Sequence, residues 1–335
     1  MEIAELVKAL KSLKGLSVST GEEREPRGWL KSGMIAFDWL VSRGKGFPLG
    51  RVIEICGDFS AGKSYVAYRV LAQAQRRGYC TVLLDTEVSY SREFGEKCGI
   101  DNEKLIVVSD VTVEKCYEFI DELLDAVKSP CVVVWDSIAA TPTDKEMSEG
   151  MDVRDLTKPH LVGKGLRMVV QKLDKTCSML LALNQLREKI ADAFVREREF
   201  APGGRAVEYH SSVKIDLKKK GVIAVDRVVR GFRIHAVVSK NRVDIPFREI
   251  DIEMRWDRDV YIPWWEGLLD ILVVEGKVVE NGGWYRFASD EKKWRASDFF
   301  EMLVENSDKV VEVLKDVFGE DVLEYFGGVA GGETV

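Results

Sequence analysis

The most informative stretch of the sequence is Arg51–Ser64, RVIEICGDFSAGKS. Its first half is apolar and rich in β-branched residues, which predicts a buried strand, and a helix is expected to follow as far as about Arg77. Between strand and helix, Gly57–Ser64 fits the pattern G-x-x-x-x-G-K-[ST], in which glycines let backbone N–H groups surround a phosphate chain at a helix N-terminus. The stretch therefore predicts a phosphate-binding loop, with Lys63 reaching the outer phosphates and the Ser64 hydroxyl ligating Mg²⁺. The alternative, a plain glycine turn, fits the strand–loop–helix context less well.

The chain up to about residue 185 alternates between short apolar runs and amphipathic segments. The apolar runs are 80–85 (CTVLLD), 105–109 (LIVVS), 131–136 (CVVVWD) and 178–185 (SMLLALNQ), and helical spacing occurs around 91–98, 113–127 and 162–175. Short strands that alternate with helices are typical of a parallel, doubly wound α/β sheet. Further runs at 211–219, 231–239 and 247–254 predict antiparallel strands that extend this sheet.

Three of the predicted strands terminate in side chains suited to a nucleotide site. Glu87 lies just beyond the run 80–85, Asp136 closes the run 131–136, and Gln185 closes the run 178–185. In open α/β sheets, ligands bind beyond the carboxyl ends of the strands, so these groups are expected near the phosphate-binding loop. We assign Asp136 to Mg²⁺, through water, Glu87 to orienting or deprotonating the attacking water, and Gln185 to sensing the terminal phosphate. The plainer interpretation is that polar residues only mark where strands leave the core.

Charge divides the chain into two unequal parts. The 335 residues include 49 Lys+Arg and 56 Asp+Glu, a net charge of −7, and residues 260–335 hold 7 basic and 16 acidic residues, a net of −9. Residues 1–259 therefore carry the remaining +2. A body so close to neutrality is unlike a protein that coats DNA through bulk charge, so any nucleic-acid binding must come from local patches.

Composition and pattern together predict three segments. Residues 1–33 hold an amphipathic helix over 3–13 and a polar connector, and residues 34–259 hold the alternating strands and helices, beginning with a short amphipathic segment at 34–42. Residues 260–335 form a small acidic α+β unit with a hairpin over 277–287 and helices over 296–304 and 307–326. The lysine run 218–220 is read as a solvated turn after a strand.

Neither a membrane span nor a secretory signal is expected. No run of about 18 apolar residues occurs, and the N-terminal segment contains acidic residues, unlike a signal peptide. The six cysteines include no C-x-x-C pair and the three histidines are scattered, which favours reduced thiols over disulfides or a zinc site. These features predict a cytoplasmic protein.

The order of the motifs resembles that of one known family. RVIEICGDFSAGKS, LLDTE, CVVVWDSIAA, LNQLREKI, APGGRAVEYHSSVKIDL and VVSKNRVDIPF follow one another with a spacing similar to that of the RecA-type recombinases of bacteria and their phages. The resemblance runs from about Met34 to Phe247, and NGGWYRF followed by two short helices is similar to that family's C-terminal domain. It implies a P-loop, RecA-type ATPase core that uses ATP and Mg²⁺.

The resemblance also implies a function in homologous recombination and DNA repair. Members of the family form helical filaments on single-stranded DNA with ATP between protomers, and pair that strand with homologous double-stranded DNA; some act in the SOS response to DNA damage. By position, Glu87 would activate the water, and Gln185 would link ATP to the DNA-binding loop behind it. Lys240 and Arg242 would reach the neighbouring protomer's ATP site, as an arginine finger does. Phe94 would lie near the base, and the N-terminal helix would pack on the adjacent subunit.

Ligand-binding residues follow from the same resemblance. The ATP and Mg²⁺ site would comprise Gly57, Asp58, Phe59, Ser60, Ala61, Gly62, Lys63, Ser64, Phe94 and Asp136. Two DNA-binding loops match residues 148–156 and 185–204, the second of which is too long for an ordinary connection. Their DNA-binding candidates are Met151, Arg154, Arg187, Lys189, Phe194, Arg196, Arg198, Gly203, Gly204 and Arg205. A solvated loop that orders only on DNA is compatible with this interpretation. The acidic C-terminal unit is expected to face outward or to gate duplex entry.

Several departures mark a divergent member of bacterial or phage origin. The loop interior is DFSA where the family has PESS, Ser64 replaces a threonine, and Ser91 stands where the family has an adenine-contacting aspartate. A ring-forming RecA-fold DNA helicase would share the loop, Glu87 and Asp136, but the NGGWYRF unit and the pair Lys240 and Arg242 favour a recombinase. An accessory DNA-binding ATPase without strand exchange is a further alternative.

Overall fold

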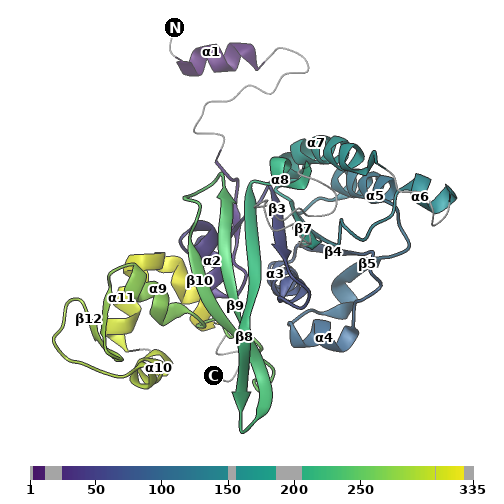
Figure 1. Ribbon diagram of the computed structural model, residues 1–335. Helices are drawn as coiled ribbons and strands as arrows, with labels where there is room; N and C mark the ends of the chain where they lie inside the picture. The colour runs from purple at the N-terminus through teal and green to yellow at the C-terminus, as the bar shows by residue number, and fades with distance from the viewer. Residues whose placement is uncertain (1–2, 12–24, 150–155, 186–205, 306, 328–335) are drawn as a thin grey trace, which may run out of the picture.

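The computed structural model of the protein describes residues 3–11, 25–149, 156–185, 206–305 and 307–327. Its centre is an eight-stranded sheet in the order β10-β9-β8-β3-β7-β6-β4-β5 (Figure 1). Six strands are parallel, namely β3 (Val52–Gly57), β4 (Cys80–Asp85), β5 (Leu105–Val108), β6 (Cys131–Asp136), β7 (Met179–Gln185) and β8 (Val213–Val225). At one edge, β9 (Val228–Asn241) and β10 (Glu249–Arg255) are antiparallel. The predicted fold is confirmed, although β8, expected to be antiparallel, runs parallel to β3.

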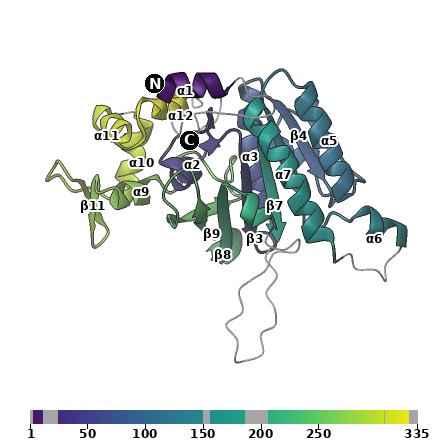
Figure 2. The same cartoon turned by 90° about the horizontal axis from the view of Figure 1, so that it is seen from above.

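Helices cover both faces of the sheet because successive residues of each buried strand point to opposite faces. One face packs on α2 (Ile35–Ser42) and α3 (Lys63–Arg76), and the other packs on α5 (Val113–Ala126) and α7 (Lys158–Thr176) (Figure 2). Shorter elements are β1 (Trp29–Leu30), β2 (Phe47–Pro48), α4 (Arg92–Lys97), a 3₁₀ turn (Asn102–Lys104), α6 (Asp144–Glu149) and α8 (Ala206–His210). Within the described ranges, no helix is both long and apolar enough to cross a membrane.

Residues 34–42 do not form the amphipathic segment that the sequence predicts. They include α2, and all eight residues of that helix are buried. The one acidic residue, Asp38, is buried completely; it accepts a hydrogen bond from the backbone N–H of Ser32 (2.9 Å) and another from the Tyr325 hydroxyl. Burial raises the pKa of Asp38 to about 6. The polar residue that suggested an exposed face is therefore an internal anchor for the C-terminal helix.

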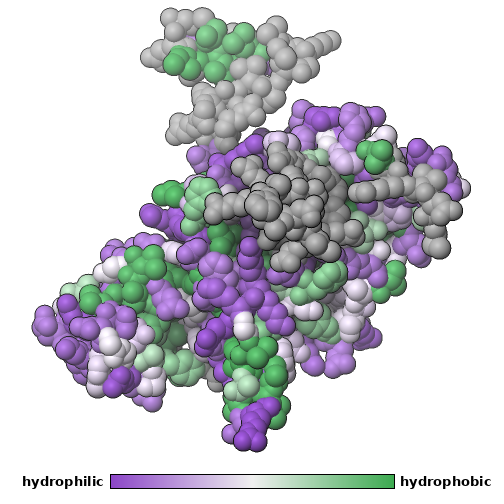
Figure 3. Space-filling model, in the orientation of Figure 1, coloured by the Kyte–Doolittle hydropathy of each residue, from purple (hydrophilic) through white to green (hydrophobic). Residues whose placement is uncertain are grey.

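The lysines at 218–220 do not form a turn. They lie inside β8, which continues beyond the end of β3 and there pairs only with β9, so that the two strands form a hairpin ribbon; β10 lines the other edge of β9 as far as Gly231. The chain reverses at Asp226 and Arg227, whose φ angles of 51° and 64° suit a tight hairpin turn. This ribbon projects from the body and carries the exposed apolar side chains of Val222, Val225, Val228 and Val229 (Figures 1 and 3).

The C-terminal elements pack on the same core as α2. They are α9 (Leu268–Val274), the hairpin of β11 (Val278–Asn281) and β12 (Trp284–Phe287), α10 (Ala296–Val304), α11 (Asp308–Phe318), a 3₁₀ turn (Glu320–Val322) and α12 (Leu323–Gly327). The single helix expected over 307–326 is broken, because Gly319 has φ 76° and ends α11. The break turns α12 back, so that Tyr325 reaches α2.

Helices α5 and α7 approach closely at a glycine. A Cβ atom at Gly165 would overlap the ring of Tyr117, whose hydroxyl donates to the Val162 carbonyl (3.1 Å). We expect Gly165→Ala to lower the free energy of unfolding by about 1–3 kcal/mol through overpacking. Urea denaturation measures the change, and Gly163→Ala, where the new methyl would meet only ordinary contacts, is the control. A destabilisation equal for both variants would contradict this packing.

Candidate nucleotide site

The loop between β3 and α3 depends on glycine at two positions. Gly57 ends β3, and a Cβ atom there would collide with the backbone carbonyl of Leu217 in β8. Gly62 precedes α3 with φ 89°, and a Cβ atom there would come within 3.0 Å of Ile234. The glycines thus allow the loop to lie against β8 and β9 while α3 begins directly behind it.

Two side chains at the start of α3 face the loop and the neighbouring strand end. Lys63 Nζ donates to the carbonyls of Gly57 (2.9 Å) and Asp58 (2.7 Å), and burial lowers its pKa, an effect opposed by the Asp136 carboxylate. Ser64 Oγ donates to Asp136 Oδ2 (2.8 Å). Burial raises the pKa of Asp136 to about 6, and the Ser64 hydrogen bond opposes that shift. An ammonium, a hydroxyl and a carboxylate thus meet at one helix N-terminus.

The expected gathering of polar strand ends occurs at the carboxyl edge of the sheet. Glu87 Oε1 accepts hydrogen bonds from Ser137 Oγ (2.6 Å) and from Gln185 Nε2 (3.0 Å). The backbone N–H of Thr86 donates to the Asp136 carbonyl (3.0 Å), which ties the end of β4 to the end of β6. The Glu87 carboxylate, just beyond β4, is therefore held by Ser137, just beyond β6, and by Gln185 at the end of β7.

Phe94 lies in an aromatic cluster beside α3. Its ring centroid is 6.2 Å from that of Tyr261, 6.4 Å from Tyr65 and 5.9 Å from Tyr68. The Tyr65 and Tyr261 rings are stacked at 5.8 Å, and the Tyr65 hydroxyl accepts from the backbone N–H of Ile262 (3.1 Å). The three tyrosines were not predicted from the sequence. Tyr65 and Tyr68 belong to the buried stripe of α3, so helical spacing indicates only that they are core residues.

Lys240 and Arg242 lie away from the loop of their own chain. Asn241 pairs with Val213, which pairs with Ile53, four residues before the strand reaches Gly57. At about 3.3 Å per residue, roughly 13 Å of strand separates the two positions. Lys240 Nζ donates to the carbonyls of Glu208 and Tyr209, and Arg242 donates to Tyr209 O (3.2 Å). Burial lowers the pKa of Lys240, and the Arg242 charge adds to that shift.

The DNA-binding candidates lie outside the described residues. They are Met151 and Arg154 in the first loop, and Arg187, Lys189, Phe194, Arg196, Arg198, Gly203, Gly204 and Arg205 in the second. Of the first loop, Ser148 and Glu149 are described at the end of α6, and of the second loop, Gln185, the residue that contacts Glu87, is described at the end of β7.

The chain is similar to one family of known proteins. Residues 13–261 match the family described as the RecA N-terminal domain. The chain is 30% identical to "Protein RecA" of Tropheryma whipplei over 285 residues. This matched region covers 85% of this chain and 64% of that protein. The chain is also 30% identical over 307 residues to "Protein RecA" of Mycobacteroides abscessus (91% and 87%) and 31% identical over 280 residues to "Protein RecA" of an Arthrobacter species (83% and 78%). With its motif order, its sheet and these matches, the chain belongs to the RecA family.

Proposed function

We propose that the protein is a cytoplasmic, ATP-dependent recombination protein that forms a helical filament on single-stranded DNA and catalyses homologous pairing and strand exchange with duplex DNA. The observation that supports this most directly is the hydrogen bond between Gln185 and Glu87. It joins the carboxylate suited to activating water to the residue from which the long charged stretch 186–205 departs. Such a connection would let the nucleotide state influence a DNA-binding loop.

The residues at the start of α3 fit an ATP–Mg²⁺ complex. Residues 57–64 offer backbone N–H groups and a helix N-terminus to the phosphates, and Lys63 supplies a positive charge there. Ser64 and Asp136 supply oxygen donors, the type that Mg²⁺ prefers, and the Asp136 carboxylate is already hydrogen-bonded to Ser64. Mg²⁺, held by Ser64 and through water by Asp136, would neutralise phosphate charge. Phe94 and its aromatic neighbours would border the base.

We propose Glu87 as the general base for hydrolysis. The carboxylate is exposed, and both of its hydrogen bonds converge on Oε1, which leaves Oε2 to accept a proton from an attacking water. Ser137 and Gln185 would keep the carboxylate oriented toward the terminal phosphate. Removing Gln185 would therefore affect both the orientation of Glu87 and the signal to the DNA-binding loop.

This role of Gln185 predicts a loss of coupling in Gln185→Ala. In the wild type, a non-hydrolysable ATP analogue should raise the affinity for single-stranded DNA by about 5- to 150-fold. The variant should bind the analogue but show less than about twofold stimulation. Fluorescence anisotropy of labelled oligonucleotide measures both, with Gln171→Ala on the exposed side of α7 as the control. Full stimulation in Gln185→Ala would contradict the role.

We further propose that Lys240 and Arg242 complete the ATP site of the next protomer. The strand register supports this, because both residues lie toward the amino end of β3, whereas the phosphate-binding loop lies at its carboxyl end. A head-to-tail assembly can bring these opposite ends together, and two cations at the phosphates would stabilise the charge of the transition state.

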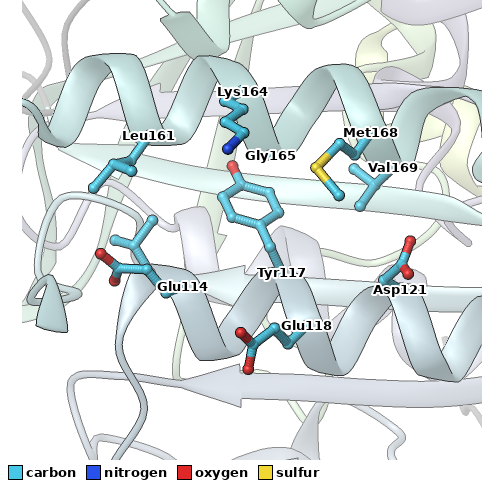
Figure 4. Close-up of a pocket in the computed structure, with 10 residues that line it drawn as sticks. Glu114, Tyr117, Glu118, Asp121, Leu161, Lys164, Gly165, Met168 and Val169 are labelled. Carbon is cyan, nitrogen blue, oxygen red and sulfur yellow. The ribbon is translucent and has the colours of Figure 1, made fainter.

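Self-assembly would use α1 (Ile3–Leu10). This helix stands clear of the body, and its apolar residues Ile3, Leu6 and Leu10 are exposed by 74%, 42% and 37% (Figure 1). A groove of about 240 Å³ between α5 and α7 offers Met168, which is 55% exposed, and is bordered by Glu114, Glu118, Asp121 and Lys164 (Figure 4). The exposed apolar side chains of an amphipathic helix can pack on the apolar part of such a groove, so we place α1 of one copy on α5 and α7 of the next.

Leu6→Gln should weaken this assembly while leaving the fold intact. Glutamine keeps helix propensity but loses apolar burial of about 1.5–3 kcal/mol per interface, so the protein concentration needed for assembly should rise about tenfold or more. Light scattering during titration measures that concentration, and Leu6→Met is the matched control. An unchanged assembly threshold in Leu6→Gln would exclude α1 from the interface.

A strand-exchange assay tests the proposed function as a whole. We expect the chain, with ATP and Mg²⁺, to pair a single-stranded circle with homologous linear duplex and to displace one strand. Lys63→Ala, which removes the ammonium from the phosphate-binding loop, should be inactive. DNA-dependent ATP hydrolysis without joint molecules would instead favour an accessory ATPase.

A further inference from the structure

Two of the six cysteines face each other across neighbouring strands. Cys80 is the first residue of β4 and Cys131 is the first residue of β6, and the parallel register places them directly opposite. The backbone N–H of Cys80 donates to the Pro130 carbonyl (3.1 Å), which fixes this alignment. Because opposite residues of adjacent strands point to the same face of a sheet, the two thiols lie side by side.

The two thiols differ in access to solvent. Cys80 is half-buried, whereas Cys131 is completely buried, and the backbone N–H of Cys131 is held by Ser178 Oγ (3.0 Å). A hydrogen bond from the Cys131 thiol lowers the pKa of Cys80 below its ordinary value, and the same interaction together with burial raises the pKa of Cys131. The accessible sulfur is thus the more acidic of the two, the combination expected of an attacking thiol and its resolving partner.

The backbone geometry admits a bond between them. Neighbouring strands lie about 4.8 Å apart, within the range of about 4.4–6.8 Å between Cα atoms that disulfides span. Both residues begin their strands, directly after the segments 77–79 and 128–130.

The other cysteines do not share this arrangement. Cys56, Cys98 and Cys116 are buried, and Cys177, although half-buried like Cys80, ends a helix. In the strand pairs of the described sheet, the one position where cysteine faces cysteine is that of Cys80 and Cys131.

We propose that Cys80 and Cys131 are a redox-active dithiol that a peroxide converts reversibly to a disulfide. The Cys80 thiolate attacks one oxygen of hydrogen peroxide, the O–O bond breaks, and a sulfenic acid forms at Cys80 while the other oxygen leaves as water after taking a proton. The Cys131 sulfur then attacks the Cys80 sulfur, the S–S bond forms, and the S–O bond breaks. The hydroxide that leaves takes the Cys131 proton as a second water, and a small dithiol reverses the reaction by exchange. This step requires neither nucleotide nor DNA.

Alkylation after oxidation tests the proposal on the native chain. The folded protein is treated with hydrogen peroxide, then denatured and alkylated with N-ethylmaleimide. The untreated chain should take up an adduct at each of its six cysteines. The treated chain should take up two fewer, should be about 2 Da lighter before alkylation, and should yield a peptide that links Cys80 to Cys131. Dithiothreitol should restore full alkylation. Six adducts after treatment, or a link between other cysteines, would overturn the proposal.

Three variants separate the two roles. Cys131→Ser should stop the reaction at the sulfenic acid, which dimedone then traps at Cys80, whereas Cys80→Ser should form neither the sulfenic acid nor the link. Cys177→Ser, which removes the other half-buried thiol, should leave the link unchanged. Circular dichroism verifies that each variant is folded. Equal dimedone labelling of Cys80 and Cys177 in the Cys131→Ser protein would show that Cys80 has no special reactivity and would contradict the assignment.

Discussion

Glu87→Gln should lower kcat for DNA-dependent ATP hydrolysis by about 10²- to 10⁴-fold while ATP binding remains close to that of the wild type. The loss is large because an amide cannot accept the proton of the attacking water, whereas general-base catalysis contributes a factor of this size. Binding is retained because Lys63, Ser64 and the backbone of residues 57–64, rather than Glu87, would hold the phosphates. The rate of phosphate release gives kcat, and the fluorescence change of a labelled ATP analogue on binding gives the affinity for the nucleotide.

Glu93→Gln is the matched control for this substitution. Glu93 lies on the exposed side of α4, where it pairs with Lys97 at 3.1 Å, and its neutralisation should leave hydrolysis unchanged. A Glu87→Gln variant with more than about a tenth of the wild-type kcat would remove Glu87 from the role of base. A variant that had lost ATP binding as well would indicate a structural role for the carboxylate.

The second large effect concerns Lys240 and Arg242. The double variant Lys240→Ala/Arg242→Ala should lose hydrolysis by about 10³-fold or more, as expected for cations that act on the transition state from a neighbouring protomer. Mixing it in equal amounts with Glu87→Gln should restore activity to about a quarter of wild type. One interface in four then joins an intact Glu87 site to intact Lys240 and Arg242 of the next copy, since the assembly is head-to-tail.

The restoration depends on the two sites being in different chains. If Lys240 and Arg242 served the nucleotide of their own chain, no mixture of the two variants would contain a complete site, and activity would stay at the level of the single proteins. Adding Lys63→Ala to the Lys240→Ala/Arg242→Ala copy should abolish the restoration, because that copy would supply the only intact Glu87.

The parallel core and the strand-end residues could be predicted from the sequence because they follow local rules. Alternating apolar strands and helices specify a parallel sheet, and the carboxyl ends of its strands share one edge, so Glu87, Asp136 and Gln185 were expected together. The hydrogen bonds to Glu87 and the contact between Ser64 and Asp136 bear out this placement. Their chemical roles remain predictions.

Features that depend on distant packing could not be predicted in this way. Helix α2 has one acidic side chain, and only the fold reveals that Tyr325, 287 residues away, covers it. The aromatic cluster joins α3 and α4 to Tyr261, and the extension of β8 past its lysines depends on its pairing with β9. The distance of Lys240 from its own phosphate-binding loop likewise follows from strand register, whereas its expected role came from the family resemblance alone.

Electron microscopy of the protein with single-stranded DNA and a non-hydrolysable ATP analogue tests the central proposal most directly. We predict extended helical filaments that form with the analogue, and that fail to form when Lys63→Ala replaces the wild type. Closed rings of fixed size would contradict the account and favour a ring-forming motor. Particles that have the same form with and without the ATP analogue would contradict the proposed coupling between ATP and DNA.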